Sequence, residues 1–155
     1  MQKIDSFTVN HLKLKQGLYV SRKDRSNGVT ATTFDLRFKA PNIEPVMNTP
    51  AIHTIEHIGA TYFRNSHLKN KIIYFGPMGC RTGFYLVVFG SLKPENIYDL
   101  VTEMLEFVIN FEGDIPGATM IECGNFSEQN LQEAKAYCKE YLYNLKTYKR
   151  FVYEN

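Results

Sequence analysis

The segment that most constrains this chain is His53-Thr54-Ile55-Glu56-His57, in which a glutamate lies between two histidines. In an α-helix, side chains three and four residues apart share one face, so His53, Glu56 and His57 would project in the same direction. Two imidazoles on one face can bind a divalent metal, and a carboxylate beside them can move protons for a metal-bound group. The alternative is a helix with two surface histidines and a salt-bridging glutamate.

The residues around this segment favour a helix. Thr49 suits the N-cap position, and Pro50 suits the first helical position because no amide hydrogen is needed there. Apolar residues recur at helical spacing and would pack the segment against a core. These residues are Ile52, Ile55, Gly59 and Tyr62.

A pair of histidines needs at least one more protein ligand to hold a metal, and Cys123 is a candidate. It lies beside Gly124 in a glycine-rich loop, where core packing would not call for a thiol. With His53 and His57 it would give a His2Cys site with one open position, which is typical of a catalytic metal. Spacing alone leaves other third ligands open, namely Glu112, Asp114, Glu122, Cys80 and Cys138.

The other two cysteines have different surroundings. Cys80 lies between Gly79 and Gly83, in a predicted turn where a thiol could act as a nucleophile or a general base. The alternative is a turn cysteine with no chemical role. Cys138 falls on the apolar stripe of a predicted helix, so we interpret it as a small buried hydrophobic residue.

Length and charge narrow the classes of function. The 155 residues suit one domain, residues 1–155, and the net charge of +2 is too small to favour nucleic acid or an anionic membrane as a partner. No apolar run approaches membrane-spanning length. The three cysteines are an odd and widely spaced set, so we expect reduced thiols in a cytoplasmic protein.

Hydrophobic periodicity predicts an α+β fold with a mainly antiparallel, twisted sheet and helices packed on it. In the strand expected at residues 29–39, Phe34, Leu36 and Phe38 alternate with charged residues, so one face would be apolar and the other charged. Residues 1–16 are expected to form an irregular arm or a first strand. Further strands are predicted at 19–20, 71–75 and 82–90, with a turn at 26–28, helices at 94–110 and after a Ser127 cap, and a loop at 111–125.

Several longer motifs resemble the S-ribosylhomocysteine lyase family, the LuxS proteins. The H-x-x-E-H helix is followed by Gly76-Pro77-Met78-Gly79-Cys80-Arg81-Thr82-Gly83-Phe84-Tyr85 and by Glu122-Cys123-Gly124-Asn125. The segments Ser6-Phe7-Thr8-Val9-Asn10-His11 and Asp35-Leu36-Arg37-Phe38-Lys39-Ala40-Pro41-Asn42 also fit. The resemblance covers essentially the whole chain in the right order.

The resemblance implies a role for each matching residue. His53, His57 and Cys123 would bind one divalent metal, ferrous iron in this family, which zinc or cobalt can replace. Glu56 and Cys80 would be the acid/base pair. The substrate pocket would lie at a homodimer interface and would be lined by Ser6, His11 and Arg37. One departure is that Tyr74 and Phe75 stand near a position where many members have an acidic residue.

The implied reaction converts S-ribosylhomocysteine to homocysteine and 4,5-dihydroxy-2,3-pentanedione, the precursor of the autoinducer-2 signal. Two isomerisations would move the sugar carbonyl along the chain before the thiol is eliminated, and such proton transfers suit a Lewis-acid metal with two bases. Arg37 would suit the homocysteine carboxylate, since a guanidinium binds carboxylates in a bidentate manner. Two other classes stay open from the residues alone: a metallopeptidase of the inverted H-x-x-E-H kind, and a non-catalytic metal- or sugar-binding protein.

Overall fold

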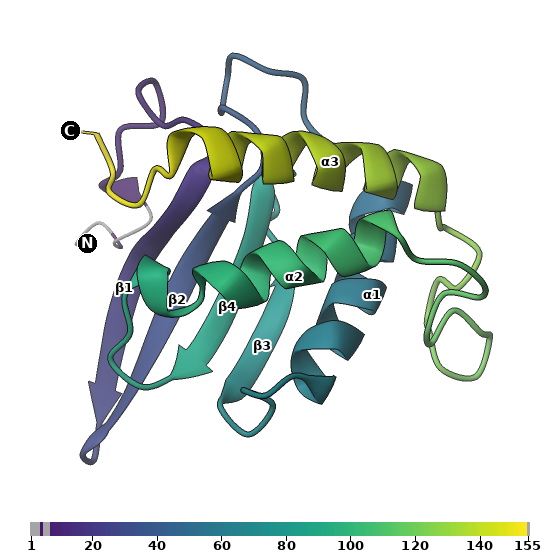
Figure 1. Ribbon diagram of the computed structural model, residues 1–155, viewed down its shortest axis with the longest axis horizontal. Coiled ribbons are helices and arrows are strands. Elements are labelled where there is room, and N and C mark those ends of the chain that lie inside the picture. Colours follow the sequence, from purple (N-terminus) through teal and green to yellow (C-terminus); the bar gives the residue numbers. More distant parts are fainter. Residues whose placement is uncertain (1–3, 5–6, 155) are drawn as a thin grey trace.

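The computed structural model describes residue 4 and residues 7–154. It shows an α+β fold in which four antiparallel strands form one sheet in the order β1-β2-β4-β3, and three α-helices pack on it. Figure 1 shows α2 and α3 crossing one face of the sheet and α1 lying beside β3. The predicted fold class is therefore confirmed.

The strands are longer than the sequence pattern indicated at some ends and shorter at others. The first hairpin joins β1 (Gly17–Ser26) to β2 (Val29–Arg37) through Asn27 and Gly28, whose φ angles of 48° and 79° fit a tight primed turn. The second joins β3 (Ile72–Pro77) to β4 (Gly83–Phe89). The predicted strand at 19–20 was thus too short, and β2 ends at Arg37 instead of at Lys39.

The helices begin at residues other than those predicted. The first, α1 (Thr49–Asn65), is preceded by Asn48 at the N-cap, so Thr49 is its first residue and not its cap. The helix expected from Pro94 is split into a 3-10 turn, η2 (Pro94–Asn96), and α2 (Tyr98–Ile109). The last, α3 (Leu131–Tyr148), is capped by Asn130, whose side chain accepts a hydrogen bond from the Glu133 amide at 3.0 Å. Ser127 is therefore not the cap, because the chain does not turn helical until Leu131.

One face of the sheet packs against the helices and forms the core. Phe34 and Leu36 of β2 point to this face, and Phe84 of β4 stacks on Phe75 of β3 with 5.1 Å between ring centres. Cys138 is fully buried on α3, as its position on the apolar stripe predicted. The core therefore consists of alternate strand residues and of one face of each helix.

Part of the opposite face of the sheet, along β2, is also shielded from solvent. The predicted alternation is confirmed in β2, yet Asp35 and Arg37 are buried. Lys39, beyond the end of β2, instead bonds to Glu140 of α3 at 2.6 Å. Val9 and His11 from the N-terminal segment, and Tyr153 from the C-terminal segment, lie over Asp35 and Arg37 and line a small cavity with them. The two ends of the chain, and no helix of the described residues, therefore cover this part of the sheet.

Candidate functional site

One side of helix α1 packs in the core, and the other side carries the candidate functional residues. Its buried residues include Ile52, Ile55 and Ile58, which join the hydrophobic core. Because the helix is anchored on that side, His53, Glu56 and His57 project from the other side, where all three are partly exposed. The predicted shared face is confirmed.

Cys123 completes a group of three potential metal ligands. The ligand atoms of His53, His57 and Cys123 lie within 4.8 Å of one another. The two histidine Nε2 atoms are 2.9 Å apart, and the Cys123 Sγ is 3.4 Å from the Nε2 of His53. Tetrahedral Zn–N and Zn–S bonds of ordinary length would place such atoms about 3.3 Å and about 3.6 Å apart. The group therefore fits a divalent metal held by two imidazoles and one thiolate.

Backbone carbonyl groups fix the orientation of both imidazole rings. The Nδ1 of His53 lies 2.9 Å from the Glu128 carbonyl oxygen, and the Nδ1 of His57 lies 2.7 Å from that of Pro116. A carbonyl only accepts, so each Nδ1 carries the hydrogen and each Nε2 offers its lone pair to the centre of the group. Hydrogen bonds of this kind are the usual second layer of a metal site.

These carbonyls belong to the long segment between α2 and α3, which runs beside α1 (Figure 1). Thr54 fastens one end of this segment, because its hydroxyl accepts from the Asn130 amide at 2.9 Å and donates to the Gln129 side chain at 2.8 Å. At the other end Gly117, with a φ of +69°, approaches His57 so closely that a Cβ there would be 3.3 Å from Nδ1. Sequence reasoning did not find these residues, since carbonyl groups have no sequence signature.

Glu56 lies beside the two histidines with its carboxylate uncommitted. It lines the same open hollow, about 410 Å³ in volume, together with His53 and His57. Within the described part of the chain it forms no hydrogen bond and no ion pair. A partly exposed carboxylate without a partner, next to potential metal ligands, is free to accept a proton from a substrate bound there.

Cys80 belongs to a second group at the β3–β4 turn. Its Sγ lies 3.1 Å from the Thr82 hydroxyl and 3.9 Å from Nη1 of Arg37. Cys80 is exposed, whereas Arg37 and Thr82 are buried. The Arg37 cation therefore lies beside an accessible thiol, and Thr82 is a contact that the sequence did not single out.

The guanidinium of Arg37 is held by the chain itself. Nη1 donates to the Thr82 hydroxyl at 2.7 Å, and Nη2 donates to the Asp35 carboxylate at 2.6 Å. Among the predicted substrate-binding residues, His11 lines the small cavity beside Arg37, and Ser6 lies outside the described residues. The structure thus brings His11, Arg37 and Cys80 into one region.

The three potential metal ligands and the group around Cys80 lie in different but connected parts of the structure. A hydrogen bond of 3.0 Å from the Met47 amide to the Arg81 carbonyl ties the Cys80 turn to the segment that enters α1. Cys80 does not line the hollow beside His53 and His57. In the described part of a single chain, the metal ligands and the thiol therefore do not share one pocket.

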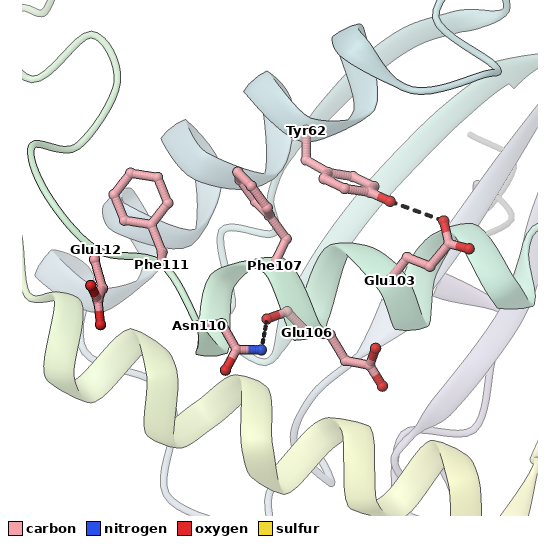
Figure 2. Close-up of a pocket in the computed structure, with 7 residues that line it drawn as sticks. All are labelled: Tyr62, Glu103, Glu106, Phe107, Asn110, Phe111 and Glu112. Atoms are coloured by element: carbon pink, nitrogen blue, oxygen red, sulfur yellow. Dashed lines mark hydrogen bonds between the residues drawn. The ribbon is translucent and has the colours of Figure 1, made fainter.

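A larger cavity, about 520 Å³, lies elsewhere and holds none of the predicted residues. Figure 2 shows that its side chains come from α1 and from α2 with the residues after it, and that the Tyr62 hydroxyl bonds to Glu103. Glu106 is paired with Lys146 at 2.7 Å. The residues that line this cavity include no group of potential metal ligands, so the size of a cavity alone does not locate the site.

Comparison with known proteins identifies the family. The sequence model of S-Ribosylhomocysteinase (LuxS) matches residues 4–151. The chain belongs to the LuxS family. A relative from Finegoldia magna, named S-ribosylhomocysteine lyase, is 58% identical over 92% of this chain and 90% of its own length. Relatives with the same name from Borreliella afzelii and Clostridium beijerinckii are 54% identical over 92% of this chain and 91% of theirs, and 49% identical over 100% of both.

The family match at residues 4–151 includes the metal ligands, Glu56, Arg37 and Cys80. The residues that converge are those of the motifs on which the family resemblance rests. Among the described residues, no helix is long and apolar enough to cross a membrane.

We expect Cys123→Ala to lose most of its bound metal, because the change removes a thiolate ligand outright. Elemental analysis of the purified protein measures this directly. Cys138→Ala is the matched control, since Cys138 is buried on α3 and is not part of the ligand group. Full metal content in Cys123→Ala would show that another group is the third ligand.

Gly117→Ala should weaken metal binding by about ten- to a hundred-fold, as disturbance of second-layer contacts does. The added methyl group would press on the His57 ring, and a chelator competition titration measures the affinity. Gly113→Ala provides the control, because Gly113 also has a positive φ, +94°, but a Cβ there meets nothing within 4 Å. Equal weakening in both variants would assign the effect to backbone strain and not to His57.

Proposed function

We propose that this protein is a metal-dependent lyase that cleaves S-ribosylhomocysteine to homocysteine and 4,5-dihydroxy-2,3-pentanedione. The observation that carries the proposal is the convergence of His53, His57 and Cys123, with the uncommitted carboxylate of Glu56 beside them. Membership of the LuxS family, whose relatives carry the name of this activity, supports the choice of substrate. The single-chain structure also supports a separate thiol, Cys80, as the second acid/base group.

The proposed reaction needs several proton transfers and one bond cleavage. A divalent metal, when bound at His53, His57 and Cys123, supplies a Lewis acid that polarises the sugar carbonyl. Glu56 and Cys80 move protons between neighbouring carbons, so that the carbonyl of the opened ribose shifts from carbon 1 to carbon 3. Removal of the proton at carbon 4 then expels homocysteine as a thiolate from carbon 5, and that thiolate takes up a proton. The enol left across carbons 4 and 5 gains a proton at carbon 5 and loses its hydroxyl proton, which gives the diketone. No external oxidant or reductant is required.

We propose ferrous iron as the resident metal, with zinc or cobalt as competent replacements. Two imidazoles and a thiolate are ligands that suit all three ions. Cys80, Cys123 and Cys138 are free, which is consistent with a reducing compartment, and we propose a cytoplasmic location. A metallopeptidase of this kind would use a glutamate as its third metal ligand. Among the described residues, the third member of the group is Cys123 and not a carboxylate, so the metallopeptidase interpretation receives no support.

We further propose that the working enzyme is a homodimer with its active sites at the interface. A single chain leaves the metal ligands and Cys80 in separate places and leaves both groups partly open to solvent. Large apolar side chains are also exposed: Ile121, two residues before Cys123, is 97% exposed, and Phe7 in the N-terminal segment is 70% exposed. Association with a second copy would cover such residues and close the pocket around the substrate.

Glu56→Gln and Cys80→Ala should keep their metal and lose thiol release by about a hundred-fold or more, as expected for loss of a general acid or base. The assay is free thiol released from S-ribosylhomocysteine by the metal-loaded protein. Solvent-deuterium exchange at carbon 2 of the substrate reports the first isomerisation separately, so the two variants should fail at different steps. Near-normal turnover by Cys80→Ala would leave the thiol as a turn residue only. No thiol release by the metal-loaded wild type would remove the proposed function.

Light scattering of the active protein should give the mass of two chains. The physical reason is that one chain does not enclose a substrate of this size, whereas binding sites bury most of their ligand. Dilution below the dissociation constant should lower the specific activity in parallel with the mass. A fully active monomer would rule out the shared active site.

A further inference from the structure

The C-terminal segment reaches back to the proposed active site. The Leu18 amide donates to the Arg150 carbonyl at 3.0 Å, which fastens this segment to the start of β1. Beyond that point the ring of Tyr153 stacks on Tyr19, with 4.6 Å between ring centres and 21° between ring planes. Two independent contacts therefore fix where Tyr153 lies. The family match ends at residue 151, so Tyr153 is outside the matched segment.

The hydroxyl of Tyr153 donates to Oδ2 of Asp35 at 2.9 Å. That same oxygen accepts from Nη2 of Arg37 at 2.6 Å, and the other Arg37 nitrogen, Nη1, faces Thr82 and Cys80. Tyr153, Asp35, Arg37 and Cys80 thus form a continuous chain of contacts. It runs from the end of the polypeptide to the thiol that we propose as an acid/base group.

This chain of contacts passes through a poorly solvated ion pair. The side chains of Asp35 and Arg37 are 2% and 4% exposed. Two of their polar atoms, Oδ1 of Asp35 and Nε of Arg37, are buried and have no partner among the described residues. A buried carboxylate with so few donors depends strongly on each one that it has, because no water replaces a lost bond.

The residues paired with Arg37 on the neighbouring strands offer its side chain no support, so its contact with Asp35 matters more for its position. The strand partners of Arg37 are Gly17 on β1 and Gly83 on β4, and neither has a side chain. Glycine leaves room for the guanidinium but gives it no lateral packing. The strand partners therefore do not hold the guanidinium from the sides, and its hydrogen bonds to Asp35 and Thr82 fix its direction.

We propose that Tyr153 is a positioning residue of the active site: through Asp35, its hydroxyl holds the Arg37 guanidinium against Cys80. The proposal rests on the function proposed above for Cys80. It assigns Tyr153 a part in the reaction, although within the described structure its hydroxyl bonds to Asp35 and not to the metal ligands or to Cys80.

The groups around Asp35 determine how the ionisation of its carboxyl group depends on pH. Burial raises the pKa of Asp35 above its usual range, and Arg37 together with the hydrogen bond from Tyr153 opposes this rise. Burial and the nearby Asp35 carboxylate raise the pKa of Tyr153, so its hydroxyl keeps its hydrogen and stays a donor. The titratable groups that act on Asp35 or feel its charge come from every surrounding segment. They are Arg37, Tyr153, His11, Tyr19, Tyr85 and Tyr141.

The test variant is Tyr153→Phe, which removes the hydroxyl and keeps the stacked ring. Among the described residues Asp35 then loses one of its two hydrogen-bond donors, so its pKa should rise further. The titration is followed by carbon-13 NMR of aspartate labelled at the side-chain carboxyl, in the diamagnetic zinc-loaded protein. Asp35→Asn assigns the signal, and Tyr143→Phe, at an exposed tyrosine, is the control that should not move it.

The effect on the reaction is measured as the ratio of kcat/KM for thiol release, Tyr153→Phe over wild type, across the pH range. Every titration that the two proteins share cancels in this ratio. We expect a ratio near one at high pH, where Asp35 is ionised in both proteins. As the pH falls, Asp35 becomes protonated first in the variant, so the ratio should drop towards about one tenth. Tyr143→Phe should give a flat ratio of one.

The Asp35 titration and the kcat/KM ratio can each contradict the proposed role of Tyr153. An unchanged Asp35 titration in Tyr153→Phe overturns the proposal, because the hydroxyl then does not support the carboxylate. A ratio that is below one but independent of pH also overturns it, since that is the signature of a purely structural loss. A wild-type protein that releases no thiol at any pH overturns the proposed function and this role with it. In that case the Asp35 titration still shows whether the Tyr153 contact exists.

Discussion

The proposed metal site depends on the packing of α1. Its isoleucines are buried in the core, and this contact determines the direction in which the opposite side of the helix points. His53 and His57 therefore face the loop between α2 and α3 because the other side of the helix is committed to the sheet. The loop is fastened to the same helix through Thr54, so its carbonyl groups and Cys123 meet the imidazoles from a defined side. Burial of apolar surface thus supplies the rigidity that a metal site needs.

A second constraint is the buried ion pair on the other face of the sheet. Asp35 and Arg37 are taken out of water by the two ends of the chain, which costs solvation energy that only good hydrogen bonds can offset. Such an arrangement is weak evidence for added stability. It is better explained by the precise placement of a cation beside the exposed thiol of Cys80, since a buried guanidinium with fixed partners has little freedom to move.

The two regions differ in how they could be found from the sequence. The metal helix has a short-range pattern, because ligands four residues apart must share a helix face. The region around Arg37 has none: Cys80 and Thr82 come from the β3–β4 turn, Asp35 comes from β2, and Tyr153 comes from the C-terminal segment. Only the antiparallel pairing of β2 with β4 brings the Cys80 turn next to Arg37. The helix starts were misplaced for a related reason, since Thr49, Pro94 and Ser127 are all good helix-starting residues, and tertiary packing selected which neighbours became helical.

The sequence by itself determined the α+β class, the hairpins, the two-faced helix with its histidines and the buried character of Cys138, because these follow from local periodicity and turn chemistry. It also provided Cys123 and Cys80 as candidates without choosing between them and their competitors. The tertiary structure decided that Cys123 joins the histidines and that Cys80 lies beside Arg37. It also placed Asp35 out of water under Tyr153. Those outcomes depend on contacts between residues far apart in the chain, and no local pattern of residues encodes such distances.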